Sequence, residues 1–185
     1  MGRISVMTTV LCITHDGKTV MASDSAGSND SRQWISDKPK IIQIGDLVFG
    51  YSGSYREAQI IEFEFSPLKK MEGESNDKYI YRTINELKEL FEKHKTTNEE
   101  TRCKGSLIIY YKKKIYLFET DYQVDDWMDP FEAIGSGSYY AVGAMTALLS
   151  SENKYTARQI AEIAIQTAIK HDPFTGGQVY IVELD

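Results

Sequence analysis

Residues 3–25 read RISVMTTVLCITHDGKTVMASDS, and two adjacent threonines, Thr8 and Thr9, open the first apolar run of this stretch. That run, TTVLCIT, is followed after the four residues HDGK by a second one, TVMAS. The dipeptide Asp16-Gly17 between the runs is a strong signal for a two-residue hairpin turn. The stretch therefore predicts two paired antiparallel strands, with Thr8 at the start of the first.

The rest of the chain reads as groups of strands followed by groups of helices. Strands are expected in a hairpin over 40–53 that turns at Gly45-Asp46, in a hairpin over 105–120, in a short segment from 131, and over 178–184. Helices are expected over about 55–65, over 79–94, after the glycine-rich turn near 135–138, and over 156–171. Such grouping favours antiparallel sheets with helices layered outside them, in one α+β domain.

Several local features refine this prediction. The polar residues 24–39 are expected to form a loop, and the lysines 112–114 a solvated turn rather than a binding patch. Phe63 is expected in the apolar stripe of the first helix, beside Ile60 and Ile61. Thr156 is expected to be the N-cap of the last helix.

Composition excludes several classes of protein. The 185 residues suit one domain, and 42% hydrophobic with 26% charged residues is ordinary globular composition. A net charge of −6 argues against a nucleic-acid partner, because phosphate binding depends on Lys and Arg. No apolar run approaches ~18 residues, and no signal-peptide core is visible, so no membrane association and a cytoplasmic location are expected. Cys12 and Cys103 lack metal-ligand spacing and read as buried thiols of a reducing compartment.

Thr8 has the neighbours that a threonine nucleophile needs. A threonine hydroxyl reacts poorly unless a base lies beside it, and the α-amine of an N-terminal threonine is one such base. Its pKa of about 7.7–8.0 leaves a neutral fraction near pH 7, and a nearby cation increases that fraction. Asp24 follows Thr8 by 16 residues, and Lys40 follows Asp24 by 16. The sequence thus offers an amine, a lysine and a carboxylate to orient that lysine.

Four separated motifs resemble one family. TTV with HDGKTVMASDS, then KPKII with GYSGSYREAQ, then AIGSGSYYA, and finally AIKHDPFTGG occur in this order. Together they resemble the proteasome β-subunits and the bacterial HslV protease subunit, which share the N-terminal-nucleophile hydrolase fold. The resemblance runs from Thr8 to the end of the chain, apart from a poorly matched middle over about 66–102. It implies a four-layer αββα sandwich of two antiparallel sheets flanked by helices.

The resemblance also implies catalytic roles. Thr8 would supply the attacking hydroxyl and the α-amine that shuttles its proton. Lys40 would lower the pKa values of both groups electrostatically, and Asp24 would orient Lys40 through a charge-assisted hydrogen bond. Gly53 would direct its backbone N–H toward the negative charge of the tetrahedral intermediate.

A supporting network and a specificity pocket are implied as well. Ser136, Asp172 and Thr175 would hold the amine and a catalytic water, with Thr175 standing where the family has serine and keeping the hydroxyl. By positional analogy, a pocket for the residue before the scissile bond would be lined by Gly27, Lys38, Ile42, Tyr51 and Tyr55. Such a pocket would favour an apolar side chain.

Each of these residues also has a purely structural interpretation. A threonine in a first strand is ordinary for a β-branched residue, and Asp24 suits a turn after a strand. Lys40 could be a surface charge, Gly53 could serve only a tight backbone bend, and Asp172 before a proline could end a helix.

A peptidase of this family implies particular partners. The substrate would be a peptide or an unfolded protein, and the resemblance implies a homo-oligomeric ring that encloses the active sites. The resemblance also implies that a separate ATP-dependent unfoldase feeds the ring. No P-loop of the type GxxxxGK[ST] occurs in the sequence, so any ATP hydrolysis would belong to that partner. No cofactor is expected, except that the resemblance leaves open a monovalent or magnesium cation at the turn over Ile169–Thr175. The three histidines show no ligand spacing, so no metal is assigned to them.

Residues 1–7, MGRISVM, precede the proposed nucleophile, and residues 8–185 form the expected single domain. The segment could be a propeptide that is removed autocatalytically, or translation could begin at Met7 and this methionine be removed. Two other functions stay open at this stage. One is a catalytically silent structural subunit of proteasome type, and the other is an amidase of the same fold that acts on a small substrate.

Overall fold

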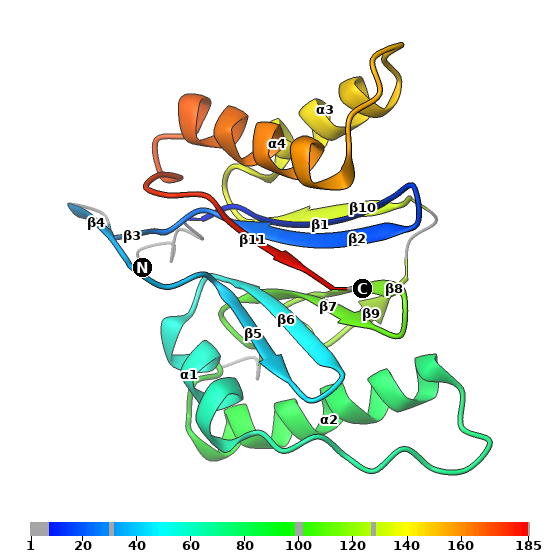
Figure 1. Cartoon of the computed structure of the whole chain (residues 1–185). Helices are drawn as coiled ribbons and strands as arrows, with labels where there is room; N and C mark the ends of the chain where they lie inside the picture. The colour runs from blue at the N-terminus through cyan, green and yellow to red at the C-terminus, as the bar shows by residue number, and fades with distance from the viewer. Residues whose placement is uncertain (1–7, 30–31, 99–101, 127–128, 185) are drawn as a thin grey trace.

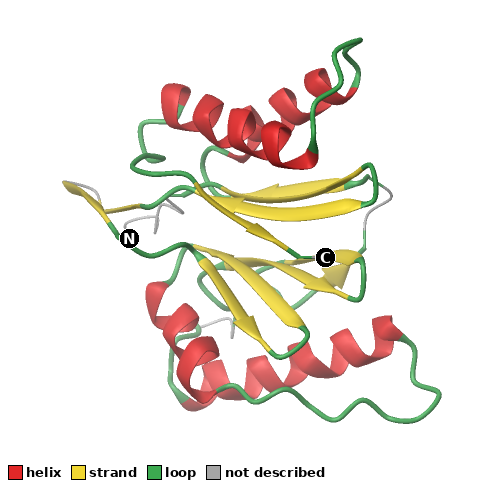
Figure 2. Cartoon of the chain, viewed as in Figure 1, coloured by secondary structure: helices red, strands yellow, loops and turns green. Residues whose placement is uncertain are grey.

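A computed structural model describes residues 8–29, 32–98, 102–126 and 129–184, so the leader predicted over residues 1–7 lies outside the described residues. Two β-sheets stack face to face, and a pair of helices covers the outer face of each (Figures 1 and 2). This confirms the expected α+β class and its four layers.

The first sheet contains the hairpin that opens the chain. Its strand order is β10-β1-β2-β11, and every pair is antiparallel. The strands are β1 (Val10–His15), β2 (Lys18–Ser23), β10 (Phe131–Ile134) and β11 (Tyr180–Glu183). Asp16 and Gly17 have φ values of 49° and 72°, as the expected two-residue turn requires. The register pairs Val10 with Ser23, which places the residues just before β1 beside those just after β2.

The second sheet has the strand order β5-β6-β7-β8-β9 and is also antiparallel. Its strands are β5 (Ile41–Ile44), β6 (Leu47–Ser52), β7 (Ser106–Tyr111), β8 (Lys114–Phe118) and β9 (Val124–Asp125). The turns fall where the sequence predicted them, at Gly45-Asp46 and at Lys112-Lys113. Between the two sheets lies a small apolar layer that includes Val10, Met21, Val48 and Ile108.

Helices α1 (Tyr55–Glu64) and α2 (Asn76–Lys93) cover the second sheet. Helices α3 (Ser138–Leu149) and α4 (Ala157–His171) cover the first. Each pair forms an apolar core with the sheet that it covers. Thr156 is the N-cap of α4, as expected, and it forms a complete capping box with Gln159. Among the described residues, none of the helices combines the length and apolar character needed to span a bilayer.

Two local predictions were wrong. The segment predicted as a loop contains a hairpin of β3 (Ala26–Asn29) and β4 (Arg32–Ile35), which the sequence hid because β4 is exposed throughout and shows no apolar alternation. Phe63 is 72% exposed instead of packing with Ile61. It lies two residues, about 200°, around the helix from Ile61. Phe65, just beyond the helix, takes the core position against Phe49.

Candidate active site

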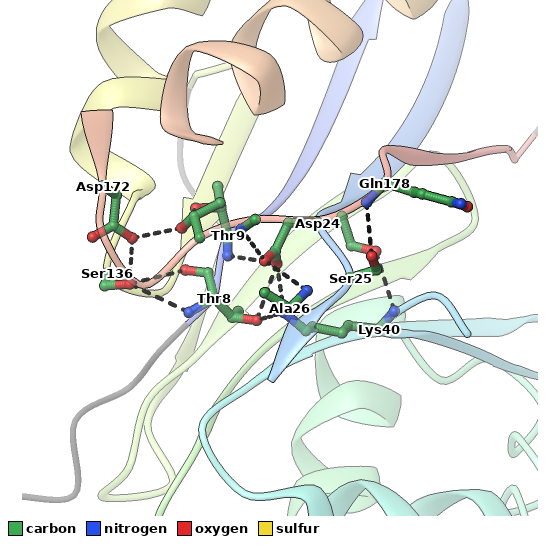
Figure 3. A network of polar contacts seen from close by, with 12 residues as sticks. Thr8, Thr9, Asp24, Ser25, Ala26, Lys40, Ser136, Asp172 and Gln178 are labelled. Carbon is green, nitrogen blue, oxygen red and sulfur yellow. Dashed lines mark hydrogen bonds and ion pairs between the residues drawn. The ribbon is translucent and has the colours of Figure 1, made fainter. Parts of the chain in front are cut away.

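Thr8 lies directly before β1, where its side chain meets two other sequence-predicted residues (Figure 3). Its hydroxyl donates a hydrogen bond to Asp24 Oδ1 at 3.1 Å and accepts one from Lys40 Nζ. Lys40 Nζ also donates to Asp24 Oδ1 at 2.5 Å. All three side chains are at most 3% exposed, so this small triangle of polar groups is shielded from bulk water.

Two different sheets supply the triangle. Asp24 follows β2 in the first sheet, and its backbone N–H donates to Thr9 O, which continues the β1–β2 pairing by one step. Lys40 precedes β5 in the second sheet, where its carbonyl accepts from Tyr51 N. The Lys40 backbone N–H donates in turn to the Ser23 hydroxyl at 3.1 Å. Lys40 therefore links the start of β5 in the second sheet to the end of β2 in the first.

The carboxylate of Asp24 has more partners than the sequence predicted. Besides Lys40, its Oδ1 accepts from the backbone N–H of Thr9 at 3.0 Å. Its Oδ2 accepts from Ala26 N at 3.2 Å and from Gly176 N at 3.0 Å. A buried carboxylate is tolerated when it is paired and hydrogen-bonded in this way. Asp24 thus ties the start of β1, the start of β3 and the turn after α4 to one point.

Burial lowers the pKa of the Lys40 ammonium, and the charge and hydrogen bond of Asp24 oppose this shift. Lys40 therefore directs a largely desolvated amino group, paired with the Asp24 carboxylate, at the Thr8 hydroxyl. Electrostatic stabilisation of a developing alkoxide is strongest in such a site, because little water screens it.

A second network holds the backbone nitrogen of Thr8 (Figure 3). This nitrogen donates to Ser136 Oγ at 3.3 Å, and Ser136 Oγ donates to Asp172 Oδ2 at 2.6 Å. The same carboxylate oxygen accepts from Thr175 Oγ1 at 2.5 Å, and the hydroxyls of Thr175 and Thr9 lie 2.8 Å apart. The structure thus brings Ser136, Asp172 and Thr175 together beside the Thr8 nitrogen, while their catalytic roles stay a prediction.

The glycine-rich turn before α3 fits closely against the start of β1. Gly135 has a φ of +98°, and a Cβ there would lie 2.1 Å from the carbonyl oxygen of Thr8. A Cβ on Gly137 would lie 2.2 Å from the Thr9 hydroxyl and 2.8 Å from that of Thr175. Only glycine permits this approach, so the turn itself positions Ser136 beside Thr8.

Thr9 belongs to this site although the sequence analysis assigned it no role, and Gly176, which follows Asp172 and Thr175 in the last of the four motifs, joins it through Asp24. Thr9 contributes its backbone N–H to Asp24 and its hydroxyl to Thr175, 166 residues away. The doublet Thr8-Thr9 was the one available signal. A hydroxyl beside the proposed nucleophile has no distinctive spacing, so its partner is visible only in the fold.

Gly53 lies at the end of β6, outside these two networks. Its φ of +101° is in the region that favours glycine, and its Cα packs against the backbone of Lys104 and Gly105. Its role as an oxyanion donor stays a prediction.

The residues proposed for a specificity pocket are only partly brought together. The rings of Tyr51 and Tyr55 have centroids 6.0 Å apart, and a Cβ on Gly27 would lie 2.7 Å from the Tyr55 hydroxyl. Trp34, which the sequence analysis did not assign, joins them with its centroid 6.4 Å from that of Tyr55. By contrast, Lys38 is exposed, and Ile42 packs against the core under α1 and α2.

Over the described part of the chain, His, Cys, Asp and Glu side chains form no group of three that could hold a metal ion. The cation considered at the turn over Ile169–Thr175 stays a prediction.

Two antiparallel sheets between two pairs of helices are the fold of the N-terminal-nucleophile hydrolase type. A family model described as "Proteasome subunit" matches residues 6–184. The chain therefore belongs to the proteasome family, of the β-subunit and HslV type. At the level of the family, it is a subunit of a threonine peptidase.

Individual relatives and structures agree with this assignment. The ATP-dependent protease subunit HslV of Anaeromyxobacter sp. (strain Fw109-5) is 30% identical over 185 residues, which cover 96% of this chain and 97% of that protein. The HslV subunit of Pediococcus pentosaceus is 27% identical over 179 residues, with 95% and 94% covered. The structure of Thiobacillus denitrificans BPH in complex with epoxomicin superimposes with a TM-score of 0.81 at 23% identity and covers 96% of this chain and 99% of that one.

Proposed function

We propose that this chain is a threonine endopeptidase subunit that hydrolyses peptide bonds of unfolded proteins, with Thr8 as nucleophile once residues 1–7 are removed. One observation carries the proposal. The Thr8 hydroxyl lies in a buried site where Lys40 Nζ donates to it and the Asp24 carboxylate accepts from it. A hydroxyl of no catalytic use rarely has a desolvated cation and an anion directed at it, because burying both charges is costly.

Removal of the leader is part of the mechanism. While Met7 precedes Thr8, the Thr8 nitrogen is a peptide nitrogen and has no basic lone pair. Hydrolysis of the Met7–Thr8 bond converts it to an α-amine of pKa about 7.7–8.0 in the absence of neighbours. Autocatalytic removal of a propeptide and removal of an initiating Met7 both lead to this same mature chain.

In the mature chain the α-amine of Thr8 accepts the hydroxyl proton while Oγ1 attacks the substrate carbonyl carbon. Lys40, oriented by Asp24, stabilises the negative charge that develops on Oγ1. The Gly53 N–H is directed to the oxyanion of the tetrahedral intermediate. The protonated amine, which donates to Ser136 Oγ, then gives its proton to the leaving amine, and an acyl ester of Thr8 forms. A water molecule, deprotonated by the same amine, hydrolyses that ester and releases the carboxylic acid product.

We also propose that the subunit works in a homo-oligomeric ring and receives its substrates from a separate ATP-dependent unfoldase. The curated relatives are named ATP-dependent protease subunits, while the chain itself contains no P-loop sequence for ATP hydrolysis. A free peptidase of broad specificity would damage cellular proteins, and enclosure in a ring limits access to unfolded chains. Mass photometry of the purified protein should show a closed oligomer and little monomer.

The test begins with the mature N-terminus. Mass spectrometry of the purified protein should show a chain that starts at Thr8, and this protein should hydrolyse fluorogenic peptides. The variant Thr8→Ala should fold normally and lose turnover to background, while the control Thr146→Ala, on the exposed face of α3, should keep it. Epoxomicin, found in complex with T. denitrificans BPH, is a second probe that the mature chain should bind. Turnover by Thr8→Ala equal to that of the wild type would exclude this mechanism.

A further inference from the structure

Glu57, in the first turn of α1, is a buried carboxylate that belongs to neither network around Thr8. Its side chain is 3% exposed, and its Oε1 accepts from the backbone N–H of Lys104 at 2.9 Å. The backbone N–H of Gly105 and the hydroxyl of Thr96 are further hydrogen-bond partners. Burial raises the pKa of the Glu57 carboxyl, and the two backbone N–H groups partly offset that shift. The carboxylate therefore holds the two residues that precede β7 in one place.

The two residues that Glu57 holds are those against which Gly53 packs. A Cβ on Gly53 would lie 2.8 Å from Lys104 O and 2.9 Å from Gly105 Cα. A Cβ on Gly105 would lie 2.4 Å from Ser52 O and 3.3 Å from Ser54 N. The segments 52–54 and 104–105 thus touch backbone to backbone, without a side chain between them. A shift of Lys104 and Gly105 must move or rotate the peptide groups around Gly53.

Glu57 is also bonded to the chain on the other side of Gly53. Ser54 caps α1, and its hydroxyl accepts from the backbone N–H of Glu57 at 3.2 Å. The backbone of Glu57 therefore anchors Ser54, while its side chain anchors Lys104 and Gly105. Gly53, which has the φ of +101° that permits the bend, lies between these two anchors.

This inference rests on the proposed function, in which the Gly53 N–H faces the oxyanion. We propose that Glu57 is a positioning residue, whose carboxylate holds Lys104 and Gly105 against Gly53 and so sets the direction of the Gly53 N–H. An oxyanion donor acts through its fixed direction, and loss of one such donor costs about 10²–10³ in kcat. Loosening the Gly53 peptide should remove part of the stabilisation that this donor gives to the transition state. We therefore expect kcat to fall about tenfold or more. KM should change little, because the donor acts mainly in the transition state.

Two variants of the mature enzyme test this role. Glu57→Gln keeps the size of the side chain, but its amide nitrogen cannot accept from a backbone N–H. Glu57→Asp keeps the charge, but its carboxylate is one methylene too short to reach Lys104 N. The matched control is Glu62→Gln, which makes the same charge change at an exposed position of the same helix and should leave kcat and KM unchanged.

Binding of two inhibitors separates positioning from general damage to the fold. A peptide aldehyde forms a tetrahedral adduct with the Thr8 hydroxyl and needs the oxyanion donor, whereas the matching peptide alcohol forms no adduct. We expect both Glu57 variants to lose at least tenfold in aldehyde affinity and to bind the alcohol as the wild type does. Equal loss for both inhibitors, or unfolding of both variants, would overturn the inference and leave Glu57 a residue of the fold alone.

The outcomes also distinguish this inference from the proposed function. If the mature wild type neither hydrolyses peptides nor binds the aldehyde, the proposed function fails. If the wild type does both, and Glu57→Gln matches it in kcat and aldehyde affinity, only the role of Glu57 is wrong.

Discussion

The ammonium group of Lys40 donates a hydrogen bond to the hydroxyl oxygen of Thr8, although 32 residues separate the two in the sequence. Lys40 lies directly before β5 of one sheet, and Thr8 lies just before β1 of the other. The contact therefore depends on how the two sheets stack and on no local element. It also places a buried positive charge where the proposed reaction develops a negative one.

Replacing Lys40 should affect stability as well as catalysis. In Lys40→Met the carboxylate of Asp24 keeps its backbone donors but loses its buried counter-charge, which should destabilise the fold by about 3 kcal/mol. Activity should fall by at least a hundredfold, because the catalytic groups act as a unit. Urea unfolding and peptide hydrolysis measure the two effects. Lys112→Met, which removes the exposed partner of Asp46, is the control and should change neither.

The alkaline limit of activity should report the titration of Lys40. Because burial lowers its pKa, Lys40 loses its charge as pH rises through a value below the ordinary 10.5, and peptide hydrolysis should fall over that range. On the acid side, activity should rise with pH as the Thr8 amine becomes neutral. A rate that stays constant up to pH 10.5, with the fold intact by circular dichroism, would contradict the electrostatic role of Lys40.

The same shift has a consequence for stability. Between the lowered pKa of Lys40 and 10.5, the unfolded chain binds more protons at this residue than the folded chain does. Stability of the wild type should therefore rise with pH in this window relative to Lys40→Met, and the gain should disappear as pH falls through the lowered value. Urea midpoints of both proteins measured across the window test this sign.

Replacing the glycine before α3 by alanine should lower the stability of the fold, whereas replacing a glycine within α3 should raise it. Gly135→Ala combines a φ of +98° with a contact of 2.1 Å to Thr8 O, so we expect a loss of at least 2 kcal/mol and of peptide hydrolysis. Gly143 lies within α3, and a Cβ there would have no atom within 4 Å. Gly143→Ala should therefore stabilise the folded protein by up to about 1 kcal/mol and keep full activity. Chemical denaturation compares the pair. Equal tolerance at both positions would mean that the turn before α3 does not position Thr8.

Thr175 should act through its hydroxyl. Thr175→Ser keeps the hydrogen bonds to Asp172 and Thr9, and activity should stay within a factor of about three of wild type. Thr175→Val has nearly the same shape without the hydroxyl, so it leaves buried polar partners unsatisfied at a cost of about 1–3 kcal/mol. Its kcat should fall about tenfold. If the valine variant is as active as the serine variant, the network around the Thr8 nitrogen has no part in catalysis.

Much of the fold was predictable because its signals are local. The turn at Asp16-Gly17 needs two positive φ values, which these residues adopt readily, and α4 begins at a threonine that caps it. The hairpin of β3 and β4 was missed because β4 is exposed throughout and neither strand shows apolar alternation in its sequence. Phe63 was predicted to lie in the core because it is apolar and close in sequence to Ile60 and Ile61. The prediction failed because an apolar side chain on a helix is buried only when its angular position faces a partner.

The candidate site was predictable only as a set of residues. The order of the motifs pointed to Thr8, Asp24 and Lys40, and the structure brings these three together. Thr9 and Glu57 were given no role, because their partners are backbone groups and hydroxyls far away in the sequence. Such groups occur everywhere in a chain, so no pattern distinguishes the ones that meet.

By itself, the amino-acid sequence determined the helices and, apart from the hairpin of β3 and β4, the main strands and their turns, since φ preferences, capping and apolar periodicity act between residues close together in the chain. Only the tertiary structure decided that a lysine before β5, a turn before α3 and the turn after α4 converge on the start of β1. These contacts join segments separated by 32 to 166 residues. The Lys40 contact forms when burial of the apolar layer between the sheets brings their ends together, and the contacts of Ser136 and Thr175 form when α3 and α4 bury their apolar faces on the first sheet.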